Sequence, residues 1–300
     1  MFSTISRVAV MILGISLLIA QHFSASVSGA PRAPVQLGEL LDQAVGVEYL
    51  EPTDEVTYDS ARNLFSQMLR GSSDGEGLSQ AWRELGFDLV QATDSEELFH
   101  VVRDQRRGGR GLFAFRTRPT APVLLEAPHA VGSDDQYTRR IALQLFRTSR
   151  AVAAGWSTIT RRQHDVAHET GTVFQAFTES FARVHPDGRI LQIHGFRRSN
   201  RTTDVGKAAD AILSNGAAKP SPWLDDVVLC LAREAQINAL AYPRDVTELG
   251  ATTNAQGHLL KALNHSGFLH VELSRQLRRT MIKNEQLIDR MFSCLGHGLR

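Results

Sequence analysis

Histidines and a glutamate stand where short apolar runs of the chain end, and these residue types could bind a metal ion and move a proton. His129 follows the apolar run 123–127 and a proline, and His194 closes the run 189–194 directly before Gly195. Apolar runs of this length are typical of buried strands. Ligands bind at the carboxyl edge of an open α/β sheet, so we expect these histidines to face a binding crevice. The alternative for His129 is a loop histidine without a role.

The run 268–274 adds a carboxylate. Strict alternation along it places His270, Glu272 and Ser274 on one face and only leucine and valine on the other. A glutamate within an apolar strand is costly unless it is paired or used in chemistry. We therefore interpret Glu272 as a carboxylate that takes part in chemistry. The alternative is an ion pair with Arg275 or Arg278.

Two histidines and a carboxylate at strand ends can supply three protein ligands to zinc and leave a fourth position for water. A separate glutamate could then take the proton from that water. The sequence therefore predicts a catalytic zinc site, although the eleven histidines of the chain leave other triplets open.

With these residues, the part of the chain from about 120 to 280 resembles the zinc-dependent carboxypeptidase-like amidohydrolases. This group includes succinylglutamate desuccinylase, aspartoacylase and N-formylglutamate amidohydrolase. The positions that match the group's metal ligands and its catalytic glutamate are His129, Asp134 or Asp135, His194 and Glu272. The group's commoner pattern has a glutamate three residues after the first histidine, where this chain has Gly132. The resemblance thus implies an aspartate as the second ligand. We favour Asp135 and leave Asp134 open.

Such enzymes commonly hold a substrate carboxylate with arginine, whose planar fork binds it through two hydrogen bonds. The candidates are Arg161, at the end of a strand predicted over 155–160, and Arg197, just past His194. Asp165 and His168 could line the same pocket or support a metal ligand, or they could be a pair on a helix surface.

Asn254 lies in a polar stretch between the last two predicted strands. We interpret it either as a donor to the substrate or as a turn residue.

The apolar spacing predicts helices and strands whose order indicates the fold class. Helices are expected at 36–49, 57–70, 78–84, 134–150, 172–184, 223–235 and from about 280, and further strands at 87–92, 99–104, 112–116 and 239–242. Alternating strands and helices favour a three-layer α/β/α fold with a mixed, mostly parallel sheet. We divide the chain into a signal peptide (1–30), helices and edge strands including a β-hairpin (31–110) and an α/β catalytic domain (111–300).

The amino terminus has the layout of a secretory signal peptide: Arg7, an apolar run over 8–20 and small residues over 24–30. We predict cleavage near Ala30, export to the periplasm or the medium, and no membrane span in the mature chain. An uncleaved anchor is the alternative. The net charge of +1 gives no reason to expect nucleic acid as a partner.

Export permits disulfides, but the chain holds only Cys230 and Cys294, far apart and without metal-ligand spacing. Cys230 lies in an apolar run, so we predict a buried core residue and no cysteine chemistry.

The sequence as a whole predicts an exported zinc hydrolase that cleaves an amide bond in an acylated amino acid or a peptide-like substrate. The alternative is a non-catalytic binding or scaffold protein of the same fold that has lost the metal, which Gly132 favours.

Overall fold

The computed structural model of the chain describes residues 35–46, 48–49, 53–72, 75–94, 97–118, 121–133 and 135–296. The predicted signal peptide and Asp134 lie outside these residues. Within the described ranges, every helix is too short or too polar to cross a membrane.

The described residues form one sheet of ten strands. In sheet order the strands are β1 (Val35–Gln36), β2 (Phe87–Asp94), β3 (Glu97–Asp104), β4 (Leu112–Arg116), β6 (Ala151–Trp156), β5 (Ala121–Ala127), β7 (Arg189–Phe196), β10 (Phe268–Ser274), β8 (Ala211–Ser214) and β9 (Ala239–Ala241). Pairs β1–β2, β6–β5, β5–β7, β7–β10 and β8–β9 are parallel, and the others are antiparallel. The predicted mixed, mostly parallel sheet is confirmed.

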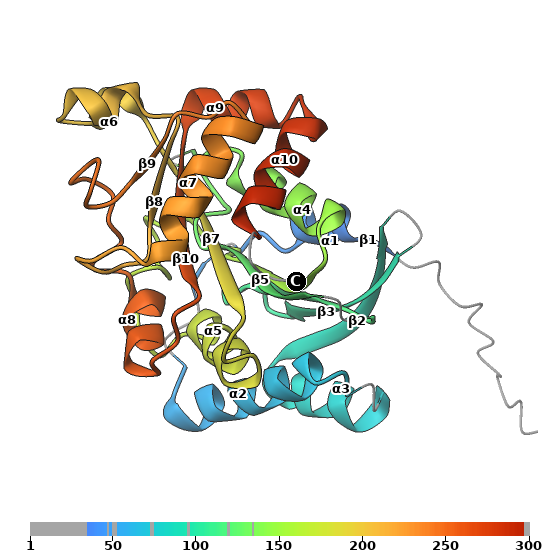
Figure 1. Ribbon diagram of the computed structural model, residues 1–300. Coiled ribbons are helices and arrows are strands. Elements are labelled where there is room, and N and C mark those ends of the chain that lie inside the picture. The colour runs from blue at the N-terminus through green and yellow to red at the C-terminus, as the bar shows by residue number, and fades with distance from the viewer. Residues whose placement is uncertain are drawn as a thin grey trace, which may run out of the picture. The chain divides into compact units, whose positions relative to one another are not determined.

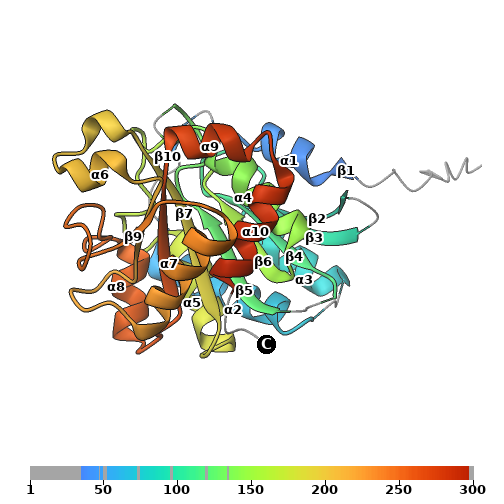
Figure 2. The ribbon, with the colours of Figure 1, turned by 45° about the horizontal axis from the view of Figure 1, so that its top comes forward.

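Helices cover both faces of this sheet (Figure 1). One layer holds α2 (Glu55–Leu69), α3 (Gly75–Glu84), α5 (Val173–Val184) and α8 (Ala255–Ala262). The other holds α1 (Leu37–Gln43), α4 (Thr138–Thr148), α7 (Pro222–Glu234), α9 (Arg275–Met281) and α10 (Glu285–Leu295). Figure 2 shows α4, α9 and α10 together on one side of the sheet. The short helices η1 (Arg198–Asn200) and α6 (Asp204–Ala208) follow β7.

The alternation predicted for β10 is present in the packing. Leu269, Val271 and Leu273 belong to the apolar cluster under α4, α7 and α10. His270 and Glu272 therefore point to the opposite face, beside α5 and α8. Because of this alternation, the polar side chains of β10 face α5 and α8, where they can form a site, and point away from the layer that contains α10.

Two predicted boundaries near the site are wrong. The strand expected over 155–160 is β6, which ends at Trp156. Its buried alanines and Gly155 have low strand propensity and give no alternation, and a Cβ on Gly155 would lie 2.8 Å from the Phe177 ring. The helix expected from residue 134 begins at Thr138, and its first turn holds no acidic residue. Asp135 is consequently free to contact other loops.

Other elements were missed or merged. Strand β8 and helices α6 and α8 have no counterpart in the sequence prediction, and the last predicted helix is two helices, α9 and α10. The break between them is set by Asn284, whose side chain accepts a hydrogen bond from the Leu287 N–H and caps α10.

The prediction of no cysteine chemistry is also wrong. Cys230 of α7 and Cys294 of α10 form a disulfide across 64 residues of sequence, with their Cα atoms 5.4 Å apart. The two helices pack against each other under the sheet. The sequence did not indicate this disulfide, because the two cysteines are far apart in the chain and only the contact between the helices brings them together.

Candidate metal centre

His129, His194 and Asp135 meet at the carboxyl edge of the central parallel strands. His129 lies two residues beyond β5, and His194 lies near the end of β7, the parallel neighbour of β5. Asp135 follows His129 in the loop that leads to α4. Side chains from one loop and one strand are thereby brought together, and all three are at least 95% buried.

The three donor atoms have the spacing of a coordination shell. His129 Nδ1 lies 3.2 Å from His194 Nδ1 and 3.0 Å from Asp135 Oδ2, and His194 Nδ1 lies 3.6 Å from that oxygen. Ligand atoms around a tetrahedral zinc ion, each about 2.0–2.1 Å from it, are about 3.3 Å apart. The three atoms therefore mark one face of such a tetrahedron and leave the fourth corner open.

Hydrogen bonds on the far side of each ring orient the two histidines. His129 Nε2 lies 2.7 Å from Asp165 Oδ1, and His194 Nε2 lies 2.9 Å from the side-chain oxygen of Gln192. An acceptor at Nε2 holds the proton there, which leaves the Nδ1 lone pair for a metal ion. Both rings are thus held in the tautomer that a metal at the shared point requires.

Asp135 is held by backbone as well as by the histidines. The Gly195 N–H donates to Asp135 Oδ2 at 3.1 Å. Burial alone would raise the pKa of Asp135, but the hydrogen bond from His129 and the positive charge of that ring lower it far below its usual range. The carboxylate is therefore ionised, as a metal ligand must be.

The two histidines have opposite pKa shifts. Burial lowers the pKa of His194 to about 4. For His129, burial also acts against the charged form, but hydrogen bonds to Asp135 and Asp165 outweigh it and raise the pKa to about 9. In the metal-free protein at neutral pH, His194 is neutral and His129 carries the charge that balances two carboxylates.

Arg278 of α9 lies directly behind this loop. It is fully buried, and it donates from Nε to the Gln136 carbonyl at 2.8 Å and from Nη1 to the Leu273 carbonyl at 2.6 Å. A Cβ on Gly195 would lie 1.6 Å from Arg278 Nη1. The arginine thus ties the segment next to Asp135 to the end of β10, and only glycine at 195 leaves room for it.

Glu272 and His270 complete the buried polar face. Donor atoms of His194, His270 and Glu272 lie within 4.8 Å of one another. Glu272 Oε1 is 3.9 Å from His270 Nε2, and Glu272 Oε2 has no hydrogen-bond partner among the described residues. Burial, with a contribution from the Asp135 charge, raises the pKa of Glu272 to about 8. Burial lowers the pKa of His270 well below its usual range. Without a metal ion, Glu272 is therefore a carboxyl group that keeps its proton up to about pH 8, and its Oε2 has no hydrogen-bond partner among the described residues.

These side chains open into a cavity of about 310 Å³. Its remaining walls are Arg161, His168 and the segment 249–254. Arg161 Nη2 donates to Asp165 Oδ2 at 3.0 Å, so Asp165 joins this arginine to His129. Asp165 is thus the supporting partner of a metal-ligand candidate rather than half of a surface pair.

His168 and Asn254 lie at the cavity, and each makes hydrogen bonds within the protein. The His168 ring bonds to the Thr253 carbonyl through Nδ1 at 3.0 Å. Asn254 caps α8 by accepting from the Gly257 N–H, and its amide donates to Gln192 at 2.6 Å. Asn254 therefore fixes the loop and Gln192, which combines the turn role with a structural hydrogen bond.

Arg197 is not brought to this cavity. It lines a second hollow with Arg275 and Arg279 on the α9 side of the sheet edge. A Cβ added to Gly195 would face Arg278 of α9, so the side chain of residue 197, two positions on, leaves the strand end on the same side. Asp134, the other predicted aspartate, lies outside the described residues.

Sequence reasoning missed Gln192 and Glu126. Gln192 donates from Nε2 to Glu126 Oε2 at 3.0 Å, and both side chains are fully buried. Glu126 also accepts from the Thr178 hydroxyl at 2.5 Å. The available signal was a glutamate and a glutamine within otherwise apolar strands, the same signal that identified Glu272.

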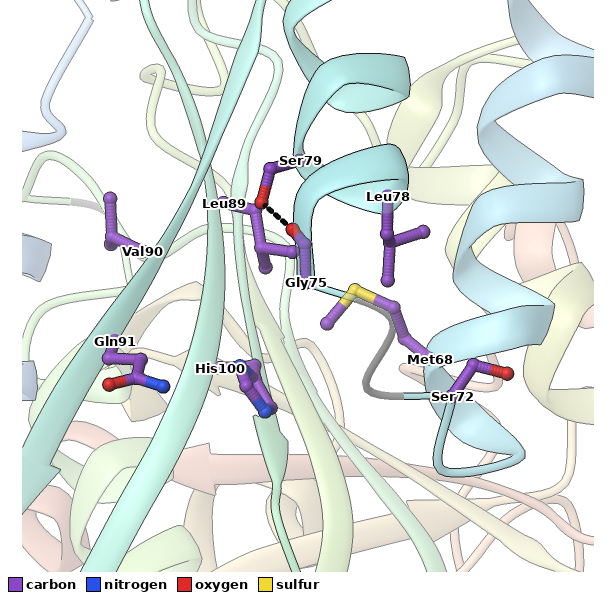
Figure 3. A pocket seen from close by; sticks show the side chains of 9 residues that line it. All are labelled: Met68, Ser72, Gly75, Leu78, Ser79, Leu89, Val90, Gln91 and His100. Carbon is purple, nitrogen blue, oxygen red and sulfur yellow. Dashed lines mark hydrogen bonds between the residues drawn. The ribbon is translucent and has the colours of Figure 1, made fainter.

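A smaller hollow of about 140 Å³ lies between α2, α3 and the strands β2 and β3. Figure 3 shows Met68, Leu78 and Leu89 beside it, with the Ser79 hydroxyl donating to the Gly75 carbonyl. The adjoining sequence 71–75, Gly-Ser-Ser-Asp-Gly, matches the Gly-x-Ser-x-Gly pattern of the serine-hydrolase nucleophile elbow. That elbow follows a strand, whereas this sequence comes after helix α2 in the chain. The candidate chemistry lies at the sheet edge.

The sequence matches no protein-family model and no curated protein. Among similar solved structures, an aspartoacylase family protein from Mesorhizobium loti is 11% identical over 70% of this chain and 66% of that chain, with a TM-score of 0.38. A bacteriophage poly-gamma-glutamate hydrolase is 12% identical over 59% of this chain and 83% of that chain (TM-score 0.36). A gene product of Agrobacterium tumefaciens is 12% identical over 59% and 87% (TM-score 0.41). Similarity at this level leaves the chemistry to be inferred from the chain's own residues.

Proposed function

We propose that this chain is a zinc-dependent hydrolase that cleaves an amide bond in an acylated amino acid or a peptide-like substrate. The observation that carries the proposal is the spacing of His129 Nδ1, His194 Nδ1 and Asp135 Oδ2, with an acceptor on the far side of each ring. Two imidazoles and a carboxylate with one open position are typical of catalytic zinc sites.

Bound there, zinc would polarise a substrate carbonyl and lower the pKa of a water ligand. The protein supplies the remaining steps. Glu272 lines the same cavity, and in its ionised form, which a nearby zinc ion would favour, it can accept the proton of the attacking water and return it to the leaving amine. Arg161 lies on the cavity wall, where its free N–H groups can bind a substrate carboxylate.

The metal-free scaffold alternative rests on Gly132, the position of the missing glutamate. Asp135, three residues later, supplies a carboxylate oxygen at ligand distance from both histidines. Because Asp135 can replace the missing glutamate, the main argument for the scaffold alternative is weakened. The zinc measurement below tests that alternative.

Export is part of the proposal. The layout of residues 1–30 supports it, and so does the disulfide between Cys230 and Cys294, because disulfides persist mainly in oxidising compartments.

The test is zinc content together with hydrolysis. We expect about one zinc per chain, lost in His129→Ala and Asp135→Ala and kept in the neighbouring control Asp134→Ala, as measured by elemental analysis after dialysis. Glu272→Gln preserves shape, so it should keep zinc while hydrolysis of a panel of N-acyl amino acids falls about 100- to 10,000-fold.

A parent protein that holds no zinc even after reconstitution would favour the scaffold alternative. Full zinc in Asp135→Ala would place the third ligand elsewhere, and a fully active Glu272→Gln would remove this glutamate from the mechanism.

A further inference from the structure

A second cavity, of about 420 Å³, lies beside the metal centre at the ends of β7 and β10. The residues that line it, which we name the arginine hollow, are Arg197, Arg198, Ser199, Arg275, Gln276 and Arg279. They come from the segment around η1 and from α9, two parts of the chain about 75 residues apart. Four positive charges therefore surround one hollow without a carboxylate in its wall.

Most of these charges lack an acidic partner. Arg198 pairs with Asp210 at 2.5 Å. Within the part of the chain that the structure describes, no carboxylate lies within ion-pair distance of Arg197, Arg275 or Arg279. Arg275 donates from Nη2 to the side-chain oxygen of Gln136, and its Nε is buried without any partner. Three guanidinium groups without an acidic partner thus line a cavity whose wall holds no carboxylate.

The surroundings make this arrangement costly. Arg278 is fully buried next to the hollow: burial lowers its pKa, the charges of Asp135 and Glu272 oppose this, and those of Arg275 and Arg197 act in the same direction as burial. Like charges this close repel, and a buried N–H without an acceptor carries a desolvation penalty. An anion bound in the hollow would offset the repulsion between its guanidinium groups.

The hollow is also near the metal centre. Arg197 lies three residues after His194, and Arg275 lies three residues after Glu272. His194 and Glu272 are register partners on neighbouring parallel strands. Three residues span at most about 10 Å, so the Cα atoms of Arg197 and Arg275 lie no further than that from those of His194 and Glu272, at the same edge of the sheet.

We propose that the arginine hollow is an oxyanion-binding site that takes a carboxylate or phosphate group. Planar guanidinium groups match both groups with paired hydrogen bonds, and Ser199 and Gln276 add neutral donors. The anion is either free or part of a molecule whose other end reaches the metal centre. This site does not depend on hydrolysis and is separate from the carboxylate position assigned to Arg161.

The experiment is calorimetric titration of the zinc-loaded protein with two probes, inorganic phosphate and the peptide Glu-Glu-Glu. Arg197→Gln and Arg279→Gln are the test variants, because both side chains are exposed and their loss leaves no buried donor unpaired. Arg83→Gln, an exposed arginine of α3, is the charge-matched control. One lost charge-assisted hydrogen bond corresponds to a rise in Kd of about tenfold or more.

We expect the parent and Arg83→Gln to bind at least one probe equally, and each test variant to bind it at least about tenfold more weakly with an unchanged circular dichroism spectrum. Parent-like binding in both test variants overturns the proposal, and so does a parent that binds neither probe at millimolar concentration.

The source of the anion is resolved by repeating the titrations with His129→Ala, which disrupts the metal centre. Peptide binding that needs both His129 and the arginines identifies an extended substrate. Binding of phosphate or peptide that needs only the arginines identifies a separate anion site.

Discussion

Each candidate histidine ligand depends on a second side chain that fixes its tautomer and its orientation. His129 and His194 each offer Nδ1 to the shared point because Asp165 and Gln192 hold the opposite nitrogen. Gln192 is itself fixed by Asn254, which donates to its oxygen, and by Glu126, which accepts from its amide. The chain of contacts extends from the buried face of β5 to the proposed zinc position.

Gln192→Met tests this support. Methionine keeps the length of the side chain but offers His194 Nε2 no comparable acceptor, so we expect zinc affinity to fall about 10- to 100-fold. Competition with a chromophoric chelator gives the affinity, and circular dichroism confirms that the variant is folded. The control is Gln80→Met on the exposed face of α3. Equal zinc affinity in parent and Gln192→Met would reduce Gln192 to a packing residue.

At the level of elements, four neighbouring parallel strands create the site. Strands β6, β5, β7 and β10 end at one edge of the sheet, and each contributes to the centre or its walls at or just beyond its end. The late start of α4 leaves Asp135 in a loop, where its carboxylate reaches the Gly195 N–H. The common direction of these strands places the site at their carboxyl edge, and the conformation of the loop before α4 makes Asp135 available as a ligand.

The disulfide between α7 and α10 stabilises the layer on the other face of the sheet. Closing a loop of this length typically contributes about 2–4 kcal/mol to the free energy of unfolding. We therefore expect the Cys230→Ser, Cys294→Ser double variant to lose about that much in urea denaturation while keeping its zinc. Dithiothreitol should lower the stability of the parent and leave the variant unchanged. A parent indifferent to reducing agent would mean that the bond contributes nothing to stability.

For the whole molecule, the fully buried Glu126 links stability to pH. Burial, partly offset by hydrogen bonds from Thr178 and Gln192, raises its pKa from an ordinary 4.5 to about 7. A raised folded-state pKa contributes stability that is complete below pH 4.5 and is lost as the pH rises through about 7. The loss amounts to about 3 kcal/mol.

Glu126→Gln removes this titration. Relative to the parent, the variant should therefore gain about 3 kcal/mol of unfolding free energy between pH 4.5 and pH 8, as measured by urea denaturation at both pH values. Glu84→Gln, an exposed glutamate of α3, should show no such pH-dependent difference. A parent and variant with parallel pH profiles would show that the Glu126 carboxyl titrates normally.

The fold class and the shared sheet edge of His129, His194 and Glu272 could be predicted from the sequence alone. Apolar runs and their alternation identify strands and their faces, and parallel strands necessarily end at a common edge. Residues 143 positions apart in the chain can therefore be assigned to one place from their local patterns alone.

The contacts that depend on strand order and loop conformation could not be predicted, and they are seen in the three-dimensional structure alone. It brought Asp135 to both histidines, set Gln192 and Asp165 behind them, separated Arg197 from the cavity and joined Cys230 to Cys294. Each of these contacts joins segments whose approach is fixed by packing across the whole sheet. Local periodicity carries no information about which distant segments will meet, because it records only the face that each residue presents.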